Sequence, residues 1–396
     1  MCESDVRSGG ALASPAMRTN PVLSRLGSNP VTAVQDLARA MRARGERLID
    51  FSIGDPREPT PEMIPAALRA ALGEVSQYPT TRGLPELRAA IAGYVKRRFG
   101  VEVDPETQVL PTSGAKEAIF SAPLAFVDRE AGDAVVYPTP GYPVYERGAA
   151  LAGAECHPVV LADDFVFRPE QVDETAWRRA AMVWICSPHN PAGSVMSRSV
   201  IEAFVARAQA AGALLCADDC YVDLYDDEPP VSVLGVTGGT MRGVLSFLSL
   251  SKRSGMTGYR SGAVVGDAGA IAALTGLRTA TGTASPEFTQ AAAVAAWSDD
   301  DHVAERRAIF AAKRRILRKA FDELGVEVVG STAGLYLWVR VDDDLSVTQR
   351  LLGSGIVVSP GRAFGPGGEE YIRLAMVPTL DECEEAAKAV KECLSN

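Results

Sequence analysis

The sequence predicts an α/β protein in which a mainly parallel sheet lies between helices, followed by a smaller α+β domain. Three observations lead to this prediction. The 396 residues are enough for two or three domains. Between residues 104 and 280, short apolar runs alternate with helical patterns. Nearly all residues within each run are apolar, which is typical of parallel strands buried on both faces.

The N-terminal part of the chain shows three helical patterns and one short strand. A helix is expected over 29–45, a strand over 48–51, and further helices over 60–73 and 85–99. The expected apolar face of the first helix consists of Val31, Val34, Leu37, Ala38 and Met41. The last of these helices is expected to bury Leu87, Ile91, Tyr94 and Val95.

The central region supplies the strands of the main sheet. Seven apolar runs have the length of strands: 108–111, 134–137, 156–160, 182–186, 213–217, 244–248 and 263–265. Helical patterns separate most of them, for example at 115–126, 199–210 and 268–277. After residue 280 the alternation stops, and the pattern becomes two helices at 287–297 and 304–324, strands at 326–329, 335–341, 356–358 and 371–377, and a helix from Asp381. This change predicts the second, α+β domain.

These patterns divide the chain into four parts. Residues 1–16 are small, polar and aperiodic, and we expect them to form a disordered tail. Residues 17–48 are expected to form an arm and a helix that join the small domain. The large domain is expected at 49–279 and the small domain at 280–396.

Charge and composition exclude several classes of function. The formal net charge is −10, which disfavours a nucleic acid or an anionic membrane as the partner. No apolar stretch approaches the length of a membrane span, and no signal or transit segment is evident, so we expect a cytoplasmic protein. The three histidines are not at metal-ligand spacing, so no metal site is expected. The Arg/Lys run within 306–319 has acidic neighbours, which favours a solvated helix face.

Polar residues follow four of the predicted strands, where open parallel sheets bind their ligands. The segment 112–115 combines small residues with a helix start, which suits a phosphate or an ordinary helix cap equally well. Asn190 stands between two prolines in a rigid loop, Asp218 follows a buried run and needs a positive partner, and Lys252 stands beside two serines. A phosphate cradle, an amide donor, a buried carboxylate and a desolvated lysine together fit pyridoxal 5′-phosphate.

The same segments carry a resemblance to a known family. In this order along the chain, they resemble the motifs of class I/II pyridoxal-phosphate aminotransferases of fold type I: YPTTRGLPELR (78–88), SGAKEAIF (113–120), SPHNPAG (187–193), DDCYVDLY (218–225), SLSKRSGMTGYRSG (249–262) and YIRLAMV (371–377). Two residues depart from the usual pattern of the family. Asp219 stands where Glu is commoner, and Arg253 stands where small residues are frequent. Both departures are small.

The resemblance implies a role for each matching residue, with the large domain binding the cofactor. Lys252 would form the Schiff base and then act as the general base, while Asp218 would keep the ring nitrogen protonated. Asn190 and Tyr221 would donate to the phenolic oxygen, and Tyr142 would stack on the ring. The cofactor phosphate would be held by Ser113, Gly114, Ala115, Ser249 and Arg260, and by Tyr78 from a partner subunit. Arg373 would bind the substrate carboxylate, assisted by the backbone at Gly54.

The resemblance also narrows the reaction. FSIGDPREPTP (51–61) and TASPEFTQ (283–290) are most similar to N-succinyldiaminopimelate aminotransferases of lysine biosynthesis, which pair their substrate with 2-oxoglutarate and glutamate. We therefore expect a homodimer with shared active sites that transaminates N-succinyl-L,L-2,6-diaminopimelate. Arg253 or Arg57 could contact a distal carboxylate of that substrate.

Other functions stay open at this stage. Within the family these are aspartate, aromatic or other amino acid aminotransferases, or a pyridoxal-phosphate enzyme of specialised metabolism that performs oxidation or β-elimination. Ser249-x-x-Lys252 also matches a Ser/Lys hydrolase signature, but the K-T-G motif that such a hydrolase needs is missing. A non-catalytic pyridoxal-phosphate-binding regulator is a further alternative.

Overall fold

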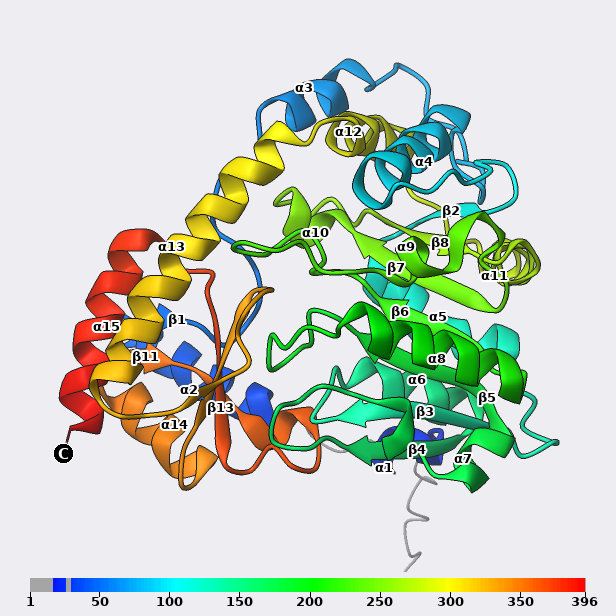
Figure 1. The fold of residues 1–396 in the computed structure, drawn as a ribbon. Helices are drawn as coiled ribbons and strands as arrows, with labels where there is room; N and C mark the ends of the chain where they lie inside the picture. Colours follow the sequence, from blue (N-terminus) through cyan, green and yellow to red (C-terminus); the bar gives the residue numbers. More distant parts are fainter. Residues whose placement is uncertain (1–16, 26–29, 396) are drawn as a thin grey trace, which may run out of the picture.

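The computed structural model describes residues 17–25 and 30–395 of the chain. The tail expected at 1–16 and the expected first residue of the first helix, Asn29, lie outside the described residues. Two layered regions stand side by side, and one long helix, α13 (Asp301–Glu323), reaches from one region to the other along the edge of the molecule (Figure 1).

The large region is built on a seven-stranded sheet in the order β2-β8-β7-β6-β5-β3-β4. β8 is antiparallel to both of its neighbours, whereas the other neighbouring strands pair in parallel. The strands are β2 (Val109–Thr112), β3 (Ala134–Thr139), β4 (Glu155–Val160), β5 (Ala180–Cys186), β6 (Leu214–Asp218), β7 (Val244–Ser249) and β8 (Gly262–Gly266). The mainly parallel α/β architecture expected from the sequence is confirmed.

Helices cover both faces of this sheet. Successive residues of β3 point to opposite faces, so Val135 packs with α5 (Ala115–Phe126), α6 (Val144–Ala152) and α11 (Ala268–Thr281). Val136 packs on the other face, where the helices are α7 (Glu174–Arg179), α8 (Arg198–Ala211) and α9 (Val233–Thr237). Because both faces are buried, the strands need continuous apolar runs, as the sequence has.

A third layer lies beyond the β2 and β8 edge. It contains α3 (Met63–Ala70), α4 (Pro85–Phe99) and α12 (Glu287–Ser298), which share one apolar cluster with β2 and β8. The four residues expected to be buried on α4 are buried. The domain boundary predicted at 279/280 groups α12 with the small domain, whereas α12 packs here against α3 and α4 because its alanine-rich face is buried in this cluster.

The small region combines an antiparallel sheet with helices, among them the C-terminal half of α13. The sheet has the order β12-β13-β10-β9, and a separate parallel pair joins β1 to β11. Its elements are α2 (Pro30–Ala43), β1 (Ile49–Asp50), β9 (Val328–Val329), β10 (Tyr336–Arg340), α14 (Asp344–Gly353), β11 (Ile356–Val357), β12 (Ser359–Pro360), β13 (Tyr371–Ala375) and α15 (Leu380–Leu394). The short α1 (Pro21–Arg25) precedes α2. The sequence patterns did not indicate α14, a ten-residue helix.

Two expectations about individual faces are wrong. Leu37, expected on the apolar face of the first helix, is 49% exposed, and only Ala38 is fully buried there, with Val34 and Met41 packed against its cluster. The basic run on α13 is not wholly a solvated face. Arg315 and Lys319 are exposed, but Arg306, Lys313 and Arg314 are buried, and the last two form ion pairs with acidic residues from other segments.

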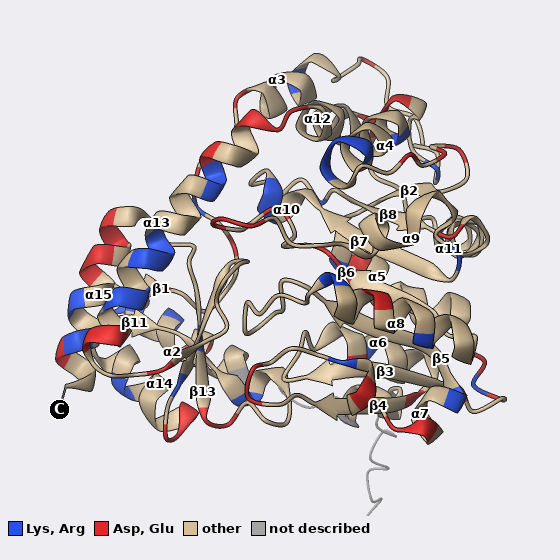
Figure 2. Ribbon diagram, viewed as in Figure 1, with Lys and Arg blue, Asp and Glu red and all other residues tan. Residues whose placement is uncertain are grey.

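Charged residues of both signs are interspersed along α13 and α15 (Figure 2). Within residues 17–25 and 30–395, no helix is long and apolar enough to cross a membrane.

Candidate active site

A cavity of about 610 Å³ opens at the carboxyl ends of the parallel strands, where the two regions meet. Seven of the residues predicted from the sequence line it: Gly54, Tyr142, Asn190, Tyr221, Lys252, Arg260 and Arg373. The structure therefore brings together residues that lie far apart in the chain. Residues of α2, among them Thr32 and Gln35, close another wall of the cavity.

Lys252 lies on α10 (Leu250–Arg253), a single helical turn that follows β7 directly. Ser249 caps this turn, because its hydroxyl accepts a hydrogen bond from the Ser251 N–H. The Lys252 amine donates to the carbonyl of Gly54. Burial lowers the pKa of Lys252 to about 8, and the nearby Arg373 and Arg260 act in the same direction. A lysine in this environment is more readily neutral, and hence nucleophilic, than a solvated one.

Asp218 is the last residue of β6 and is buried below the cavity. The Tyr145 hydroxyl donates to its Oδ2 at 2.7 Å, and the Cys220 N–H donates to its Oδ1 at 3.2 Å. Burial raises the pKa of Asp218, whereas these hydrogen bonds lower it. No lysine or arginine among the described residues forms an ion pair with Asp218, so its expected positive partner is not a side chain of the part of the chain that the structure describes.

Arg373, on β13, is a buried cation that has no carboxylate partner among the described residues. Its Nη2 donates to the carbonyl of Ser52 at 2.8 Å, and its Nη1 donates to Asn190 Oδ1 at 3.0 Å. Its guanidinium stands 4.2 Å from the centre of the Tyr336 ring and 4.4 Å from that of Phe364. The arrangement fixes the arginine against the cavity wall and leaves its positive charge uncompensated.

The predicted phosphate cradle lies at the N-terminus of α5. Gly114 precedes this helix with φ of 82°, and a Cβ added there would stand 2.5 Å from Arg260 Nη2. The guanidinium of Arg260 thus lies directly over the backbone of Gly114, at a helix end that favours anions. Ala115 is the first residue of α5, and the Ser113 hydroxyl lies 3.4 Å from that of Ser285.

Two tyrosines of the site were missed in the sequence, as was Lys116, which also lines the cavity. The Tyr336 hydroxyl lies 2.9 Å from that of Tyr221, and a Cβ on Gly54 would stand 2.6 Å from the Tyr336 oxygen. Tyr145 holds Asp218 and stacks on Trp184, with ring centres 5.0 Å apart. Both tyrosines occupy ordinary apolar positions in a strand or helix pattern, so only spatial proximity identifies them.

Other residues singled out in the sequence lie away from the cavity. Tyr78 is fully exposed. Arg57 pairs with Glu382 at 3.2 Å, and Arg253 points into a buried network behind the site, so neither side chain lines the cavity. Asp219 is buried and accepts hydrogen bonds from Ser232 and Ser246; burial raises its pKa to about 7. Among the described residues no group of His, Cys, Asp and Glu is arranged to hold a metal ion.

Comparisons with known proteins agree with this geometry. The family profile described as "Aminotransferase class I and II" matches residues 46–390. The 4-dedimethylamino-4-oxo-anhydrotetracycline transaminase OxyQ of Streptomyces rimosus is 39% identical over 87% of this chain and 93% of its own. The LL-diaminopimelate aminotransferase of Dehalococcoides mccartyi strain BAV1 is 36% identical over 87% and 90%, respectively.

Comparison with a solved structure shows that a protein named as an aminotransferase has the same fold as this chain. The probable N-succinyldiaminopimelate aminotransferase of Thermus thermophilus superposes with a TM-score of 0.86 at 29% identity. The match covers 91% of this chain and 99% of the Thermus chain. The fold resemblance therefore extends over both regions.

Proposed function

This chain belongs to the class I and II aminotransferases, which use pyridoxal 5′-phosphate, and on that premise we propose that it transfers the amino group of a diaminopimelate-type amino acid to a 2-oxo acid. The proposed acceptor is 2-oxoglutarate. The observation that carries the proposal is Arg373, a buried cation at the cavity wall whose charge no carboxylate of the described residues balances. Such a guanidinium binds a carboxylate through two parallel hydrogen bonds.

The residues at the cavity fit this cofactor. Close contact between the Gly114 backbone and the Arg260 guanidinium leaves a compact cationic cradle at the start of α5, suited to a phosphate. We propose that Ser113, Gly114, Ala115, Ser249 and Arg260 hold the phosphate. Asp218 is a buried carboxylate without a cationic side-chain partner among the described residues, which suits a protonated ring nitrogen.

The remaining contacts to the ring follow from hydrogen-bonding capacity. Asn190 accepts from Arg373 through Oδ1, which leaves its amide N–H₂ free to donate to the cofactor's phenolic oxygen. Tyr221 lines the same wall and is proposed as the second donor to this oxygen. Tyr142, which also lines the cavity, would cover the face of the ring.

Lys252 is the proposed catalytic residue. When bound, pyridoxal phosphate supplies a ring that accepts the electrons released as the substrate Cα–H bond breaks. Lys252 would bind the cofactor at its aldehyde carbon and, once the substrate amine had displaced it there, would be free to take the proton from Cα. Its lowered pKa would favour the neutral amine that both roles need. Its hydrogen bond to the Gly54 carbonyl directs the amine into the cavity.

The length of the substrate is proposed from the cavity and from the relatives. Lys116 is exposed, lines the cavity and supplies a second cation for a distal carboxylate. The relative in Dehalococcoides is named for LL-diaminopimelate, whereas the Thermus protein is named for the N-succinyl derivative. We propose the N-succinyl form as the substrate and the free form as its nearest alternative. Lys116→Met should raise KM for either compound more than for alanine.

A second candidate substrate comes from the Streptomyces rimosus relative, which is more similar in sequence than the diaminopimelate enzyme at nearly the same coverage. That relative is named for an oxo derivative of a tetracycline. A corresponding function here would be the amination of a cyclic ketone in specialised metabolism. The two candidates differ in what the cavity receives, because only the diaminopimelate compounds present more than one carboxylate, two in the free form and three in the N-succinyl form.

Single-turnover spectroscopy tests the proposed function and its alternatives. The cofactor-loaded protein would be mixed separately with N-succinyl-LL-diaminopimelate, LL-diaminopimelate, aspartate, phenylalanine and glutamate. We expect the fastest loss of the lysine–cofactor absorbance with a diaminopimelate compound, and at least ~10³-fold slower conversion in Lys252→Ala. Normal turnover by Lys252→Ala would rule out the proposed mechanism. Reaction with glutamate alone would favour a ketone acceptor, to be tested next.

We also propose that two subunits share each active site. Tyr78 precedes a proline in an extended segment and is fully exposed in the single chain, as are the nearby Leu72 and Val75 in large part. In a homodimer its hydroxyl would donate to the phosphate of the neighbouring subunit's cofactor. Heterodimers of Lys252→Ala with Tyr78→Phe should regain one intact site and recover activity above both parents. Activity at the level of the parents would place Tyr78 outside the neighbouring site.

A further inference from the structure

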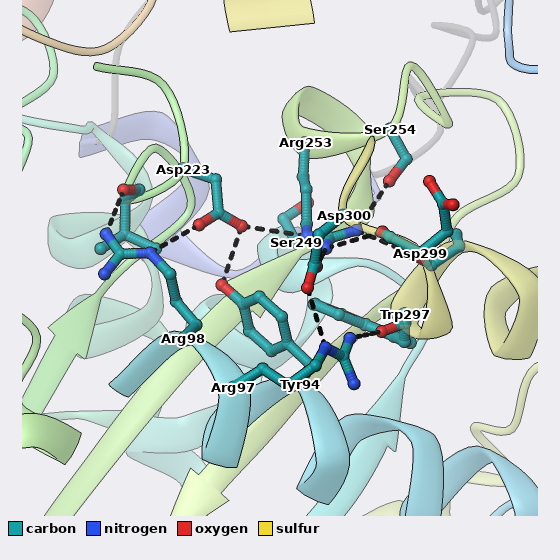
Figure 3. A network of polar contacts seen from close by, with 12 residues as sticks. Tyr94, Arg97, Arg98, Asp223, Ser249, Arg253, Ser254, Trp297, Asp299 and Asp300 are labelled. Atoms are coloured by element: carbon teal, nitrogen blue, oxygen red, sulfur yellow. Dashed lines mark hydrogen bonds and ion pairs between the residues drawn. The ribbon is translucent and has the colours of Figure 1, made fainter. Parts of the chain in front are cut away.

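Arg253 follows the proposed catalytic lysine directly, yet its side chain enters a buried polar network behind the cavity (Figure 3). The side chain is 3% exposed, and each of its nitrogens has an acceptor. Nε donates to Asp223 Oδ2 at 3.0 Å, Nη1 to the Ala296 carbonyl at 2.7 Å and to Ser254 Oγ at 3.5 Å. Nη2 donates to the Asp299 carbonyl at 3.1 Å and to Asp300 Oδ1 at 2.5 Å.

The network has two sides that meet at Arg253. On one side, Asp223 also accepts from the Tyr94 hydroxyl at 2.8 Å and from Arg98 Nε at 3.0 Å. This side ties the loop after β6 to α4. On the other side, Asp300 also pairs with Arg97 at 2.8 Å, at the end of α12. The guanidinium stands 4.8 Å from the centre of the Tyr94 ring and 5.4 Å from that of Trp297, which fixes its plane.

The next two residues of the chain contact the same region. The Ser254 hydroxyl lies 2.9 Å from Nε2 of His302, whose Nδ1 lies 2.6 Å from Asp299 Oδ1. Gly255 lies against the guanidinium of Arg306, because a Cβ at Gly255 would stand 2.9 Å from its Nη1. The residues that directly follow Lys252 are therefore held by the segment 299–306.

That segment connects the two regions of the molecule. Asp299 and Asp300 separate α12, which packs against α3 and α4, from α13, which packs against α15 of the small region (Figure 1). α10, by contrast, is one turn long and has no length over which its own hydrogen bonds could hold it rigidly. The position of Lys252 thus depends on contacts that α10 makes with its surroundings.

We propose that Arg253 is a positioning residue, which fixes the position of Lys252 relative to the segment 299–306 that connects the large and small regions. Any change in the angle of α13 would reach Lys252 through Asp300 and Arg253. The inference rests on the proposed catalytic role of Lys252. It gives a role to Arg253, which stands in the segment 249–262 at a position where small residues are frequent in the family, and whose side chain does not line the cavity.

The variant Arg253→Met tests this proposal, with Arg98→Met as the matched control. Both arginines bind Asp223, but only Arg253 continues to Asp300 and the link. For Arg253→Met we expect a fall in kcat of at least ~10-fold with KM changed less than ~3-fold, because a small displacement of the reacting group slows the chemical step. For Arg98→Met we expect a lower melting temperature with kcat within ~2-fold of wild type.

Hydrogen exchange of the cofactor-free proteins gives a readout that does not depend on catalysis. Deuterium uptake by the peptide spanning 250–258 should rise in Arg253→Met and remain unchanged in Arg98→Met. Asp300→Ala removes the ion pair between Asp300 and Arg253. Because the Asp300 side chain is partly exposed, this variant should fold even if Arg253→Met does not, and deuterium uptake by the 250–258 peptide should rise in the same way. Arg253→Lys keeps the charge but not the fork of donors and should give an intermediate kcat.

The outcomes separate the two proposals. Equal exchange and equal kcat in Arg253→Met and Arg98→Met, or unchanged exchange in Asp300→Ala, would overturn the positioning role. Full activity of Lys252→Ala would overturn the proposed function, whatever the exchange data show. Raised exchange together with unchanged kcat in Arg253→Met would also overturn the positioning role, because a loosened α10 would then not matter for the reaction.

Discussion

Asp218 is the last residue of β6 and Asp223 lies in the loop that follows it; both are buried, but their surroundings differ completely. Asp223 is bound by two arginines and a tyrosine. Asp218 is bound by a tyrosine and a backbone amide, without a cationic side-chain partner among the described residues. The arginines show the same contrast, because Arg253 meets two carboxylates whereas Arg373 meets only an amide and a carbonyl.

The difference separates a structural network from a binding site. A buried charge is costly unless it is paired, so the paired set around Asp223 is complete within the protein. The unpaired carboxylate of Asp218 and the unpaired guanidinium of Arg373 have opposite requirements, a cation for Asp218 and an anion for Arg373. Such incompleteness is expected where the missing partners belong to a ligand. Four substitutions test this contrast, from the largest expected effect to the smallest.

Replacing Asp218 with Asn should slow single-turnover proton abstraction by ~10³-fold, because the ring nitrogen loses the charge that stabilises its protonated form. The cofactor-free variant should not be less stable than wild type. Burial raises the pKa of Asp218, so wild type loses stability as the pH rises from 3.8 through the folded-state pKa. The melting temperature of the variant, relative to wild type, should therefore be higher at pH 8 than at pH 4. An unchanged reaction rate would contradict the role of Asp218.

The same substitution at Asp223 should act on folding instead. Asp223→Asn leaves two largely buried arginines without their shared carboxylate, which costs roughly 3–5 kcal/mol of unfolding free energy. Urea unfolding of the cofactor-free protein measures this cost. The control Glu102→Gln breaks an exposed ion pair with Lys96 and should leave the unfolding midpoint unchanged. If Asp223→Asn is as stable as wild type, the network is not the structural counterpart of the cavity.

Arg373→Lys should weaken binding of the amino acid. The lysine keeps the charge but offers no pair of parallel donors, and the loss of one charge-assisted hydrogen bond, about 1.5–3 kcal/mol, corresponds to a ~10–100-fold rise in KM. Steady-state kinetics with the best donor of the panel measure this change. The cofactor affinity of the variant serves as the control and should stay near that of wild type. A KM equal to that of wild type would mean that the carboxylate binds elsewhere.

Tyr145→Phe should give the smallest effect. It removes one hydrogen bond to Asp218, about 1 kcal/mol, without changing the aromatic stack on Trp184. Because this bond lowers the pKa of Asp218, the folded-state pKa should rise further in the variant. The stability loss should therefore be greater at pH 8, where a larger fraction of Asp218 is ionised, than at pH 4. Equal losses at both pH values would show that the bond does not favour the charged form.

The sequence predicted the strands of the large sheet and the residues at their carboxyl ends. Asp218 and Lys252 could be singled out as candidates because a charged residue where a buried apolar run ends is unusual on its own. The ordered motifs then extended the prediction to residues without a local signal, such as Arg373. The fold class and the dependence on pyridoxal phosphate follow from that reasoning and are confirmed.

What the sequence could not provide depends on contacts between distant segments. Tyr336 reaches the cavity from a strand of the small region, and its neighbour Tyr221 is 115 residues away. Arg306, Lys313 and Arg314 were expected on a solvated face because the basic run has acidic neighbours in sequence. The ion-pair partners of Lys313 and Arg314 lie in distant segments instead, and Glu58, the partner of Lys313, is 255 residues away. Arg253 was an unexplained departure for the same reason. A local pattern does not record which distant charge a side chain meets in the folded protein.

The parallel pair of β1 and β11 has a consequence for the synthesis of this protein. Ile49 pairs with Ile356, so the first strand of the small region has no partner until most of the remaining chain has been made. All strands of the seven-stranded sheet are synthesised after Ile49 and before Ile356. The large region can therefore collapse first, with β1 left outside it. A chain that stops before β11 would expose an unpaired strand edge, which invites aggregation.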